Sequence, residues 1–467
     1  MWRECGTRGR STKRGAAGDS RRQTVGAYSH AAATSGFHLR LKKRTFSWMR
    51  TPKQTSKQEA KYKYYAGFAG SFVDDVLDRY ATKGSRVLDP WNGSGTTTSA
   101  CANRGISSVG MEINPAMLPV SWARLASRDQ TFALCGETES LRTSQLADDA
   151  PSESDDLLTV FFTERTAESF RGLRQKLILV AEKSAADSGS FEARAVAGVA
   201  FLILAEVLRE SLRPLRGTNP SWYSRPRKGK AKIDLDATSI QHLLSRSTSA
   251  MKESALAKTG EREPDHVWPE LLLGDSRADL ASLGSFDLVI GSPPYCTRID
   301  YAVATTPEIL ALGGIGERSF AALRHNIMGS AITDPCILLA DDGRHGPLLK
   351  TTLELIQNHP SKAASTYYLR YFFRYFEDLL RSLDQIAQVV KDGQIVLVVQ
   401  NSYFKNIEVN LRAIVVEHLG SRGFELASSW SHEARSPIAW SNPRFKLYRS
   451  TNISAEDVLV FNVRTPT

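Results

Sequence analysis

The chain has 467 residues, enough for one large domain or two ordinary domains with a sizeable buried core. Its hydrophobic fraction of 42% and charged fraction of 24% are typical of a soluble globular protein, and we expect no secretory signal. Five cysteines, none in a CxxC pair, exclude a dense disulfide framework and any evident metal site, and they favour a reducing, cytoplasmic setting. The longest apolar stretch, residues 195–208, contains Glu206 and is short for a bilayer span, so it predicts a buried helix and no membrane partner.

The formal net charge of +10 is concentrated at the N-terminus. Residues 1–58 hold 14 Lys and Arg and two acids, whereas the remainder holds 46 bases and 48 acids. This basic segment has no sustained periodicity, so we predict disorder. It is typical of a nucleic-acid-binding arm or a transit peptide, but we favour a vector leader or an upstream start codon, with Met49 the next methionine.

Order is expected to begin near Lys61 with a strand–helix alternation. Helical spacing predicts a helix over 72–80, and apolar residues then predict a buried strand over 86–88. The Gly-rich loop 89–98 leads into an Ala-rich helix, and a second strand follows over 106–111. This order defines a βαβ unit.

A helical insertion is predicted between residues 116 and 265, and the strand–helix alternation then resumes. The insertion contains three helical stretches, near 156–183, 191–213 and 236–257. The later elements are expected at these positions: strands over 270–273, 286–290 and 395–399, helices over 367–390 and 410–419, and two last strands near 445–448 and 458–463. Strands alternating with helices predict a mostly parallel sheet covered on both faces.

The first motif with chemical content is the loop DPWNGSGTT, which directly follows a predicted strand. Gly93 and Gly95 remove side chains where the backbone must approach a ligand closely, and the next helix presents unpaired N–H groups. Glu112 ends the following strand, where an acidic side chain can accept both hydroxyls of a ribose. The loop lacks the Gly-Lys-Ser/Thr ending of a P-loop and is not GxGxxG, so alone it also fits a plain βα turn.

The second motif is Ser292-Pro293-Pro294-Tyr295, immediately after the apolar strand FDLVI. The prolines fix the backbone and remove two N–H donors, so the loop presents carbonyl oxygens. An acceptor cluster beside an aromatic ring suits a planar base with an exocyclic amine. Ser292 Oγ and the Pro293 carbonyl would accept the amino hydrogens, and Tyr295 would stack on the base. A proline turn with a packing tyrosine is the alternative.

Together these motifs resemble the S-adenosylmethionine-dependent DNA amino-methyltransferases, which modify cytosine N4 or adenine N6. The resemblance rests on RVLDPWNGSGTT, VGMEINP, LLLGDS and FDLVIGSPPY, with KYKYYAGFAGSF before them. It implies a class I methyltransferase fold, Rossmann-like, with a seven-stranded mostly parallel sheet and an antiparallel C-terminal hairpin. The domains would be a basic tail at 1–58, a catalytic domain at 59–115 and 266–467, and the helical insertion at 116–265.

The resemblance also implies residue roles. The cofactor S-adenosylmethionine would be held by a set of loop and strand-end residues: Asp89, Pro90, Asn92, Gly93, Gly95, Thr96, Glu112 and Asp275. Catalysis would fall to Ser292, Pro293, Pro294 and Tyr295, which would hold a target base flipped out of DNA. Neither a metal nor a catalytic cysteine is needed, so Cys296 is expected to be incidental. Arg298, Asp300 and Tyr301 face either the same pocket or solvent.

Serine at the first position of SPPY resembles the cytosine-N4 subgroup more than the adenine-N6 subgroup. The alternatives are an adenine-N6 DNA methyltransferase, an RNA base methyltransferase and a catalytically silent DNA-binding relative. Restriction-modification would make a cognate restriction or phage-defence component a further partner.

The favoured DNA-recognition region is the basic, aromatic stretch 209–232, which holds eight bases and one acid. Such a run can neutralise phosphates, and an aromatic ring can stack or wedge. The residues expected to contact DNA are Trp222, Tyr223, Arg225, Arg227 and Lys228. A solvated loop on a helical cap fits equally well, and the loop-rich, Gly- and His-containing segment 313–360 is a second candidate.

Overall fold

The computed structural model describes residues 49–52, 67, 69–144, 146, 156–217, 222–226, 231–256, 266–278, 280–333, 342–435 and 453–464. All the described segments belong to one compact unit that begins at Lys43.

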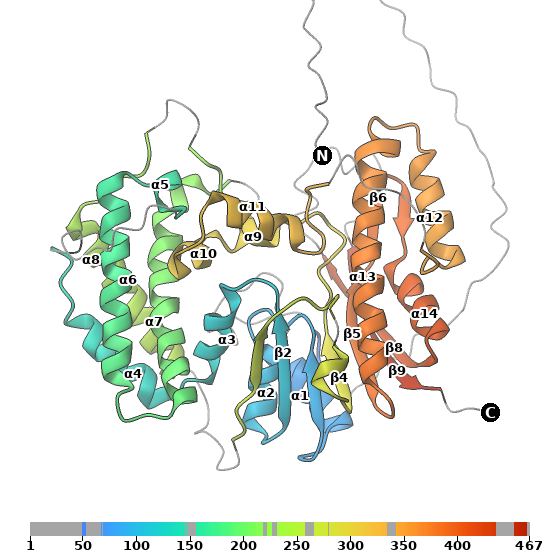
Figure 1. The fold of residues 1–467 in the computed structure, drawn as a ribbon, viewed down its shortest axis with the longest axis horizontal. Coiled ribbons are helices and arrows are strands. Elements are labelled where there is room, and N and C mark those ends of the chain that lie inside the picture. Colours follow the sequence, from blue (N-terminus) through green and yellow to red (C-terminus); the bar gives the residue numbers. More distant parts are fainter. Residues whose placement is uncertain are drawn as a thin grey trace, which may run out of the picture. The chain divides into compact units, whose positions relative to one another are not determined.

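A seven-stranded sheet forms the centre of this unit, in the order β3-β2-β1-β4-β5-β9-β8 (Figure 1). Its strands are β1 Arg86–Asp89, β2 Ser107–Glu112, β3 Glu270–Leu273, β4 Leu288–Gly291, β5 Gln394–Gln400, β8 Phe424–Arg435 and β9 Ile453–Val463. The first five are parallel, whereas β9 runs antiparallel between β5 and β8. This is the class I methyltransferase fold, and the predicted fold class is confirmed.

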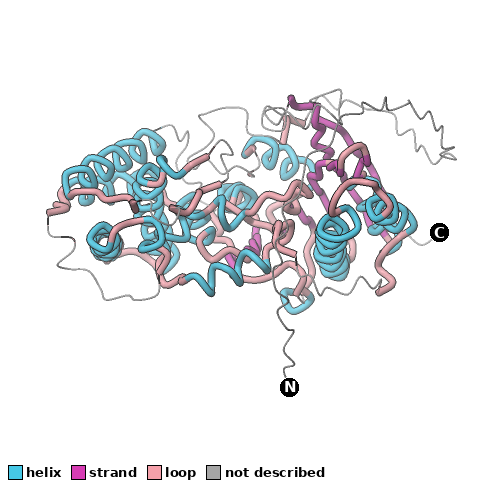
Figure 2. Tube along the Cα trace, turned by 90° about the horizontal axis from the view of Figure 1, so that it is seen from above, coloured by secondary structure: helices cyan, strands magenta, loops and turns pink. Residues whose placement is uncertain are grey.

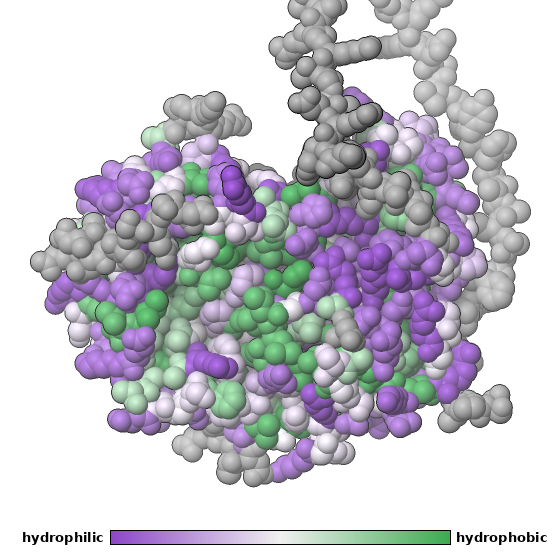
Figure 3. Space-filling view, viewed as in Figure 1, coloured by the Kyte–Doolittle hydropathy of each residue, from purple (hydrophilic) through white to green (hydrophobic). Residues whose placement is uncertain are grey.

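Alternating side chains explain why the sheet is covered on both faces. On β5, Val396 and Val398 join one apolar core, and Ile395, Leu397 and Val399 join the other. The first core is closed by α1 Gly70–Tyr80 and α2 Thr96–Asn103. The second is closed by α12 Pro347–Gln357, α13 Leu369–Val389 and α14 Leu411–Ser421. The opposite, outward face of α13 is hydrophilic (Figure 3).

The predicted insertion forms a separate helical core beside the sheet (Figures 1 and 2). Its helices are α3 Met117–Leu125, α4 Arg128–Glu139, α5 Leu158–Phe161, α6 Glu164–Ser184, α7 Ser190–Ser211 and α8 Ala237–Leu256. Three helices that follow the SPPY motif share this core: α9 Tyr301–Ala304, α10 Thr306–Leu312 and α11 Glu317–Asn326. The helical unit is therefore built from two segments of the chain, one on each side of β4.

The apolar stretch 195–208 lies within α7 and is mostly buried, as predicted. Within the described residues, no helix combines the length and the apolar character that a membrane crossing requires.

The structure corrects several expected elements. Residues 49–52 belong to the predicted basic tail, yet Met49 is buried and Arg50 binds Asp75 of α1 at 2.7 Å. The segment 313–360 is not simply loop-rich, because α11 and α12 lie within it. The strand expected near 445–448 falls outside the described residues. The hairpin instead pairs β9 with β8, which sequence analysis missed.

Candidate active site

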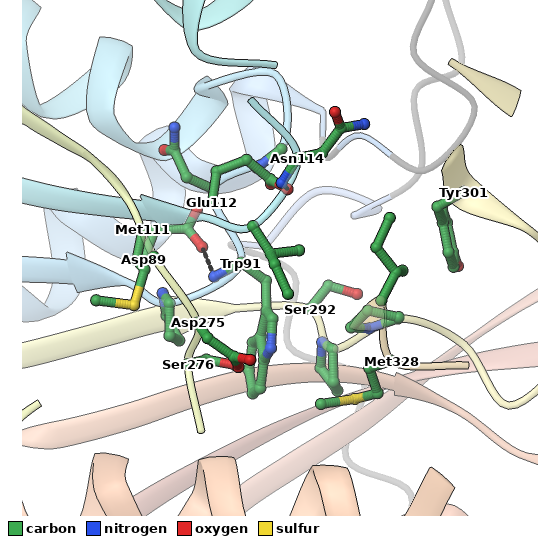
Figure 4. A pocket seen from close by; sticks show the side chains of 18 of the residues that line it. Asp89, Trp91, Met111, Glu112, Asn114, Asp275, Ser276, Ser292, Tyr301 and Met328 are labelled. Atoms are coloured by element: carbon green, nitrogen blue, oxygen red, sulfur yellow. Dashed lines mark hydrogen bonds between the residues drawn. The ribbon is translucent and has the colours of Figure 1, made fainter. Parts of the chain in front are cut away.

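A pocket opens where the neighbouring strands β1 and β4 end, which is the point where the strand order reverses direction. Open α/β sheets bind ligands at this point. The pocket gathers the four SPPY residues and seven of the eight expected cofactor residues, namely Asp89, Pro90, Asn92, Gly93, Thr96, Glu112 and Asp275. Figure 4 shows the side chains of Glu112, Asp275 and Ser292 around the Trp91 indole.

The loop after β1 is held by side-chain hydrogen bonds to the protein. Asn92 accepts from Thr98 Oγ1 at 3.0 Å and donates through Nδ2 to Ser121 Oγ at 3.1 Å. The backbone N–H of Asn92 also bonds to the Met111 carbonyl at 2.9 Å. Asn92 is only 4% exposed, so its side chain fixes the loop from behind.

The two loop glycines serve different purposes. Gly93 has φ +50° and donates its N–H to Glu112 Oε2 at 2.8 Å, inside the pocket. Gly95 does not line the pocket. It has φ +77°, and a Cβ there would lie 2.8 Å from Ser121 Cβ, so it is required by helix packing rather than by ligand approach.

Two carboxyl groups, those of the buried Asp89 and the half-buried Glu112, set the electrostatics of this half of the pocket. The pKa of Asp89 is raised to about 7, chiefly by burial and also by the nearby Glu112, against the hydrogen bonds from Thr97 and Trp91. Burial also raises the pKa of Glu112, although its oxygens accept backbone N–H groups from Asn114 and Gly93. A cationic or hydroxyl-bearing ligand would satisfy such a pair.

Asp275 follows β3 and lines the pocket. Its carboxylate is held by a network of charged side chains. Arg277 donates to both of its oxygens at 2.5–3.0 Å, and to Asp378 of α13 at 2.5 Å. Burial opposes ionisation of Asp275, but the hydrogen bonds from Arg277 prevail and lower its pKa. Asp275 is therefore an ionised acceptor held in one orientation.

The hydrogen-bond donors of the SPPY loop are bonded to other residues of the protein. Ser292 Oγ donates to the Val398 carbonyl at 3.0 Å, and the Tyr295 hydroxyl donates to Glu456 of β9 at 3.0 Å. The Tyr295 N–H donates to the Tyr301 hydroxyl at 3.1 Å. Because the two prolines have no N–H, the loop offers mainly oxygen acceptors to the pocket.

Buried hydroxyl and thiol groups around this loop stay protonated. Burial raises the pKa of Tyr295 and Tyr375 well above their ordinary value, and the Tyr375 hydroxyl donates to the Pro294 carbonyl at 2.9 Å. Burial likewise raises the pKa of the Cys296 thiol, which is 1% exposed. A buried thiol of this kind is a poor nucleophile.

Trp91 is a pocket residue that sequence analysis left without a role. Its indole packs on β4, where a Cβ on Gly291 would lie 2.9 Å from the ring. Its Nε1, like Thr96 Oγ1, is buried with no hydrogen-bond partner, which leaves donors for a ligand. Tyr301 also lines the pocket. Asp300 caps α9 and pairs with Arg324 at 2.7 Å, so it serves the fold.

Three of the five expected DNA-contacting residues lie in the described part of the chain, and one of these three is buried. Tyr223 is only 6% exposed because it packs into the helical core, so of the two expected stacking rings, Trp222 and Tyr223, only Trp222 lies at the surface. Trp222 is 41% exposed, and Arg225 forms an ion pair with Glu317 at 3.0 Å. Arg227 and Lys228 lie outside the described residues.

Comparison with known proteins agrees with this site. A family model described as DNA methylase, of the N6 and N4 type, matches residues 25–121, which include the cofactor loop and Glu112. The Type II methyltransferase M.BsoBI of Geobacillus stearothermophilus is 25% identical over 295 residues, 56% of this chain and about half (54%) of that relative's length. The Type II methyltransferases M.AvaI of Nostoc and of Anabaena variabilis are each 22% identical over 410 residues, 80% of this chain and 81% of theirs.

The sheet topology is that of the class I methyltransferase fold, and the pocket lies at the carboxyl ends of its parallel strands. The chain is similar, over residues 25–121, to the DNA methylase family model and, over longer stretches, to these Type II methyltransferases.

Proposed function

We propose that this protein transfers a methyl group from S-adenosylmethionine to the exocyclic amine of a base in DNA, with cytosine N4 as the target. The observation that carries the proposal is the acceptor-rich SPPY loop in the same pocket as the carboxyl groups after β1, β2 and β3. An amine is the complement of such a loop, because it brings donors to fixed acceptors.

The residues around the first half of the pocket fit the cofactor. Glu112 would accept the ribose hydroxyls, Asp275 would accept the adenine amine, and Asp89 would face the ammonium group. The unpartnered Trp91 Nε1 and Thr96 Oγ1 would gain acceptors. When bound, S-adenosylmethionine supplies the electrophilic methyl group.

The SPPY loop would act on the second substrate by orientation. A base in a duplex stack is out of reach, so the target base would be flipped into the pocket. Ser292 Oγ keeps lone pairs free because its hydrogen is donated to the Val398 carbonyl at 3.0 Å. With the Pro293 carbonyl, it would accept the amine hydrogens and draw the nitrogen lone pair out of conjugation with the ring. Catalysis would then consist of positioning and fixed electrostatics.

The choice of cytosine N4 rests on serine at the first position of the motif. The relatives are Type II methyltransferases, which supports DNA as the substrate and a cognate restriction endonuclease as a functional partner.

Methyl transfer from labelled cofactor to unmodified DNA and to RNA, measured in parallel, tests the proposal. We expect label in DNA, and a loss of rate of about 100- to 1,000-fold in Ser292→Ala, the cost of removing one oriented hydrogen-bonding group. Lys391→Gln is the matched control, because Lys391 is exposed in the turn before β5, at the opposite end of that strand from the pocket. Label in RNA alone, or full activity of Ser292→Ala, would contradict the proposal.

A further inference from the structure

Unusual backbone geometry is concentrated beside the SPPY loop. Among the described residues, Arg298, Ala363 and Lys405 are the non-glycine residues with positive φ, at 57°, 64° and 57°. L-residues with side chains rarely adopt this conformation, and such strain clusters at functional sites. A π-helical turn, Ala364–Tyr368, directly follows Ala363, and π-helical turns are also frequent at functional sites.

These three positions form one contiguous cluster. The Arg298 guanidinium lies 5.1 Å from the centre of the Tyr368 ring, and Tyr368 closes the π-helical turn that begins after Ala363. The Tyr368 ring lies 4.8 Å from the Phe404 ring, and Phe404 immediately precedes Lys405. Lys405 occupies the turn of the hairpin formed by β6 Ser402–Phe404 and β7 Ile407–Val409, and β6 lies near the end of α13 in Figure 1.

The cluster is bonded directly to the catalytic loop. Arg298 lies three residues after Tyr295, and its N–H donates to the buried Tyr371 hydroxyl at 3.0 Å. Ser402 of β6 donates to the Cys296 carbonyl. The strained backbone at Arg298 therefore sets the direction of its side chain relative to the SPPY loop.

Arg298 is an exposed cation without an acidic partner among the described residues. Its guanidinium contacts are with Tyr368, through the ring face and through the hydroxyl at 3.3 Å. Lys362 on the neighbouring segment is also exposed. The acid on the hairpin, Glu408, accepts from Asn401 at 3.2 Å. The other arginines near the SPPY motif contrast with this, since Arg324 is paired with Asp300.

We propose that Arg298, Lys362 and Tyr368, here called the strained edge, bind the phosphate backbone of DNA next to the flipped base. The inference rests on the proposed function. A base held by SPPY is covalently joined to its sugar and flanking phosphates, so those phosphates must come close to the loop. An arginine held over an aromatic ring and bonded to its hydroxyl presents its remaining N–H donors in a restricted direction, which suits a phosphate.

Substitution of Arg298 by asparagine tests this, because asparagine tolerates positive φ and carries no charge. Arg298→Asn should raise the dissociation constant for duplex DNA about tenfold at moderate salt. It should also reduce the slope of log affinity against log salt concentration by about one, as expected for the loss of one phosphate contact. Arg298→Lys should restore most of the slope. Cofactor affinity and thermal stability of Arg298→Asn should match the wild type.

The outcomes separate this inference from the proposed function. If the wild type methylates DNA and Arg298→Asn keeps its affinity and salt slope, the strained edge does not bind phosphate. If Arg298→Asn loses cofactor binding and stability together with DNA binding, the residue is structural and the inference also fails. If the wild type binds the cofactor but neither binds nor methylates DNA, the proposed function itself is wrong.

Discussion

Two regions of this protein combine arginine with aromatic side chains, and their surroundings differ. In the insertion, Arg225 is paired with Glu317 and Tyr223 is buried in the helical core. At the strained edge, the exposed Arg298 lies over the half-buried Tyr368 ring and has no acidic partner among the residues described. Local composition therefore does not identify a phosphate-binding surface. The decisive property is whether acids from other elements neutralise the cations.

The largest effect is expected in the scaffold of the helical unit. Arg171 and Asp156 form a buried ion pair at 2.8 Å, with side chains 5% and 3% exposed. Asp156→Ala removes the buried partner of Arg171 and leaves this buried charge with only the exposed Glu164, so it should lower the free energy of unfolding by about 3–5 kcal/mol, measured by urea denaturation. Glu164→Gln is the matched control, because the Glu164 side chain contacts the same arginine at 3.3 Å but is 67% exposed. It should cost less than about 1 kcal/mol. Equal losses of unfolding free energy in the two variants would show that the buried ion pair contributes no more to stability than the exposed one.

An intermediate effect, on folding stability, is expected from the protonation of Asp89 in the pocket. Asp89 has a pKa of about 7, raised from 3.8, so the folded chain retains a proton between about pH 4 and 7 that the unfolded chain loses. The contribution of this group to folding stability is full below about pH 4 and falls as the pH rises toward 7.

Cofactor binding should show the opposite trend with pH. A cationic ligand binds ionised Asp89 better, so cofactor affinity should rise with pH, by at most about tenfold per unit, and level off above about pH 7. Asp89→Asn should remove this dependence. Asp275→Asn should retain it, because Arg277 holds the pKa of Asp275 low. Calorimetric titration across this pH range measures the slope, and an unchanged slope in Asp89→Asn would exclude Asp89 as the titrating group.

The smallest effect is expected at the insertion surface. Arg225→Ala removes a cation already paired with Glu317, so its DNA affinity should stay within about twofold of the wild type, with little change in salt slope. Filter binding over a salt series compares it with Arg298→Asn. A larger loss in Arg225→Ala than in Arg298→Asn would reverse the comparison and restore the insertion as the principal phosphate-binding surface.

The sequence was sufficient to predict the half of the molecule that forms the pocket, because the signals there are local. A strand followed by DPWNGSGTT, a strand ending in Glu112 and a strand ending in SPPY each occupy a few residues, and strands β1, β2 and β4 bring them together. Strand β8 was missed because its sequence, FELASSWSHEAR, is polar and contains a bulge between Leu426 and Ser428. The burial of Tyr223 depends on the helical core around it, and nothing in its own segment signals that packing.

The packing of Trp91 likewise could not be predicted from its own segment. Its position in the loop is local, but its packing depends on Gly291 at the end of β4, about 200 residues further along the chain. The pairing of Arg277 with Asp378 similarly requires α13 to pack beside the loop after β3. Long-range packing therefore adds the groups that orient and tune the residues that the motifs identify.

Mass spectrometry of the nucleosides from DNA methylated by the wild-type protein tests the central claim most directly. An acceptor-rich SPPY loop, together with a buried Cys296 whose pKa is raised by burial, predicts methylation of an exocyclic amine, with N4-methylcytosine as the product. N6-methyladenine would retain the amine chemistry and overturn the assignment of cytosine. Methylation of a ring carbon, or no methylated nucleoside in DNA while the cofactor binds, would contradict the account.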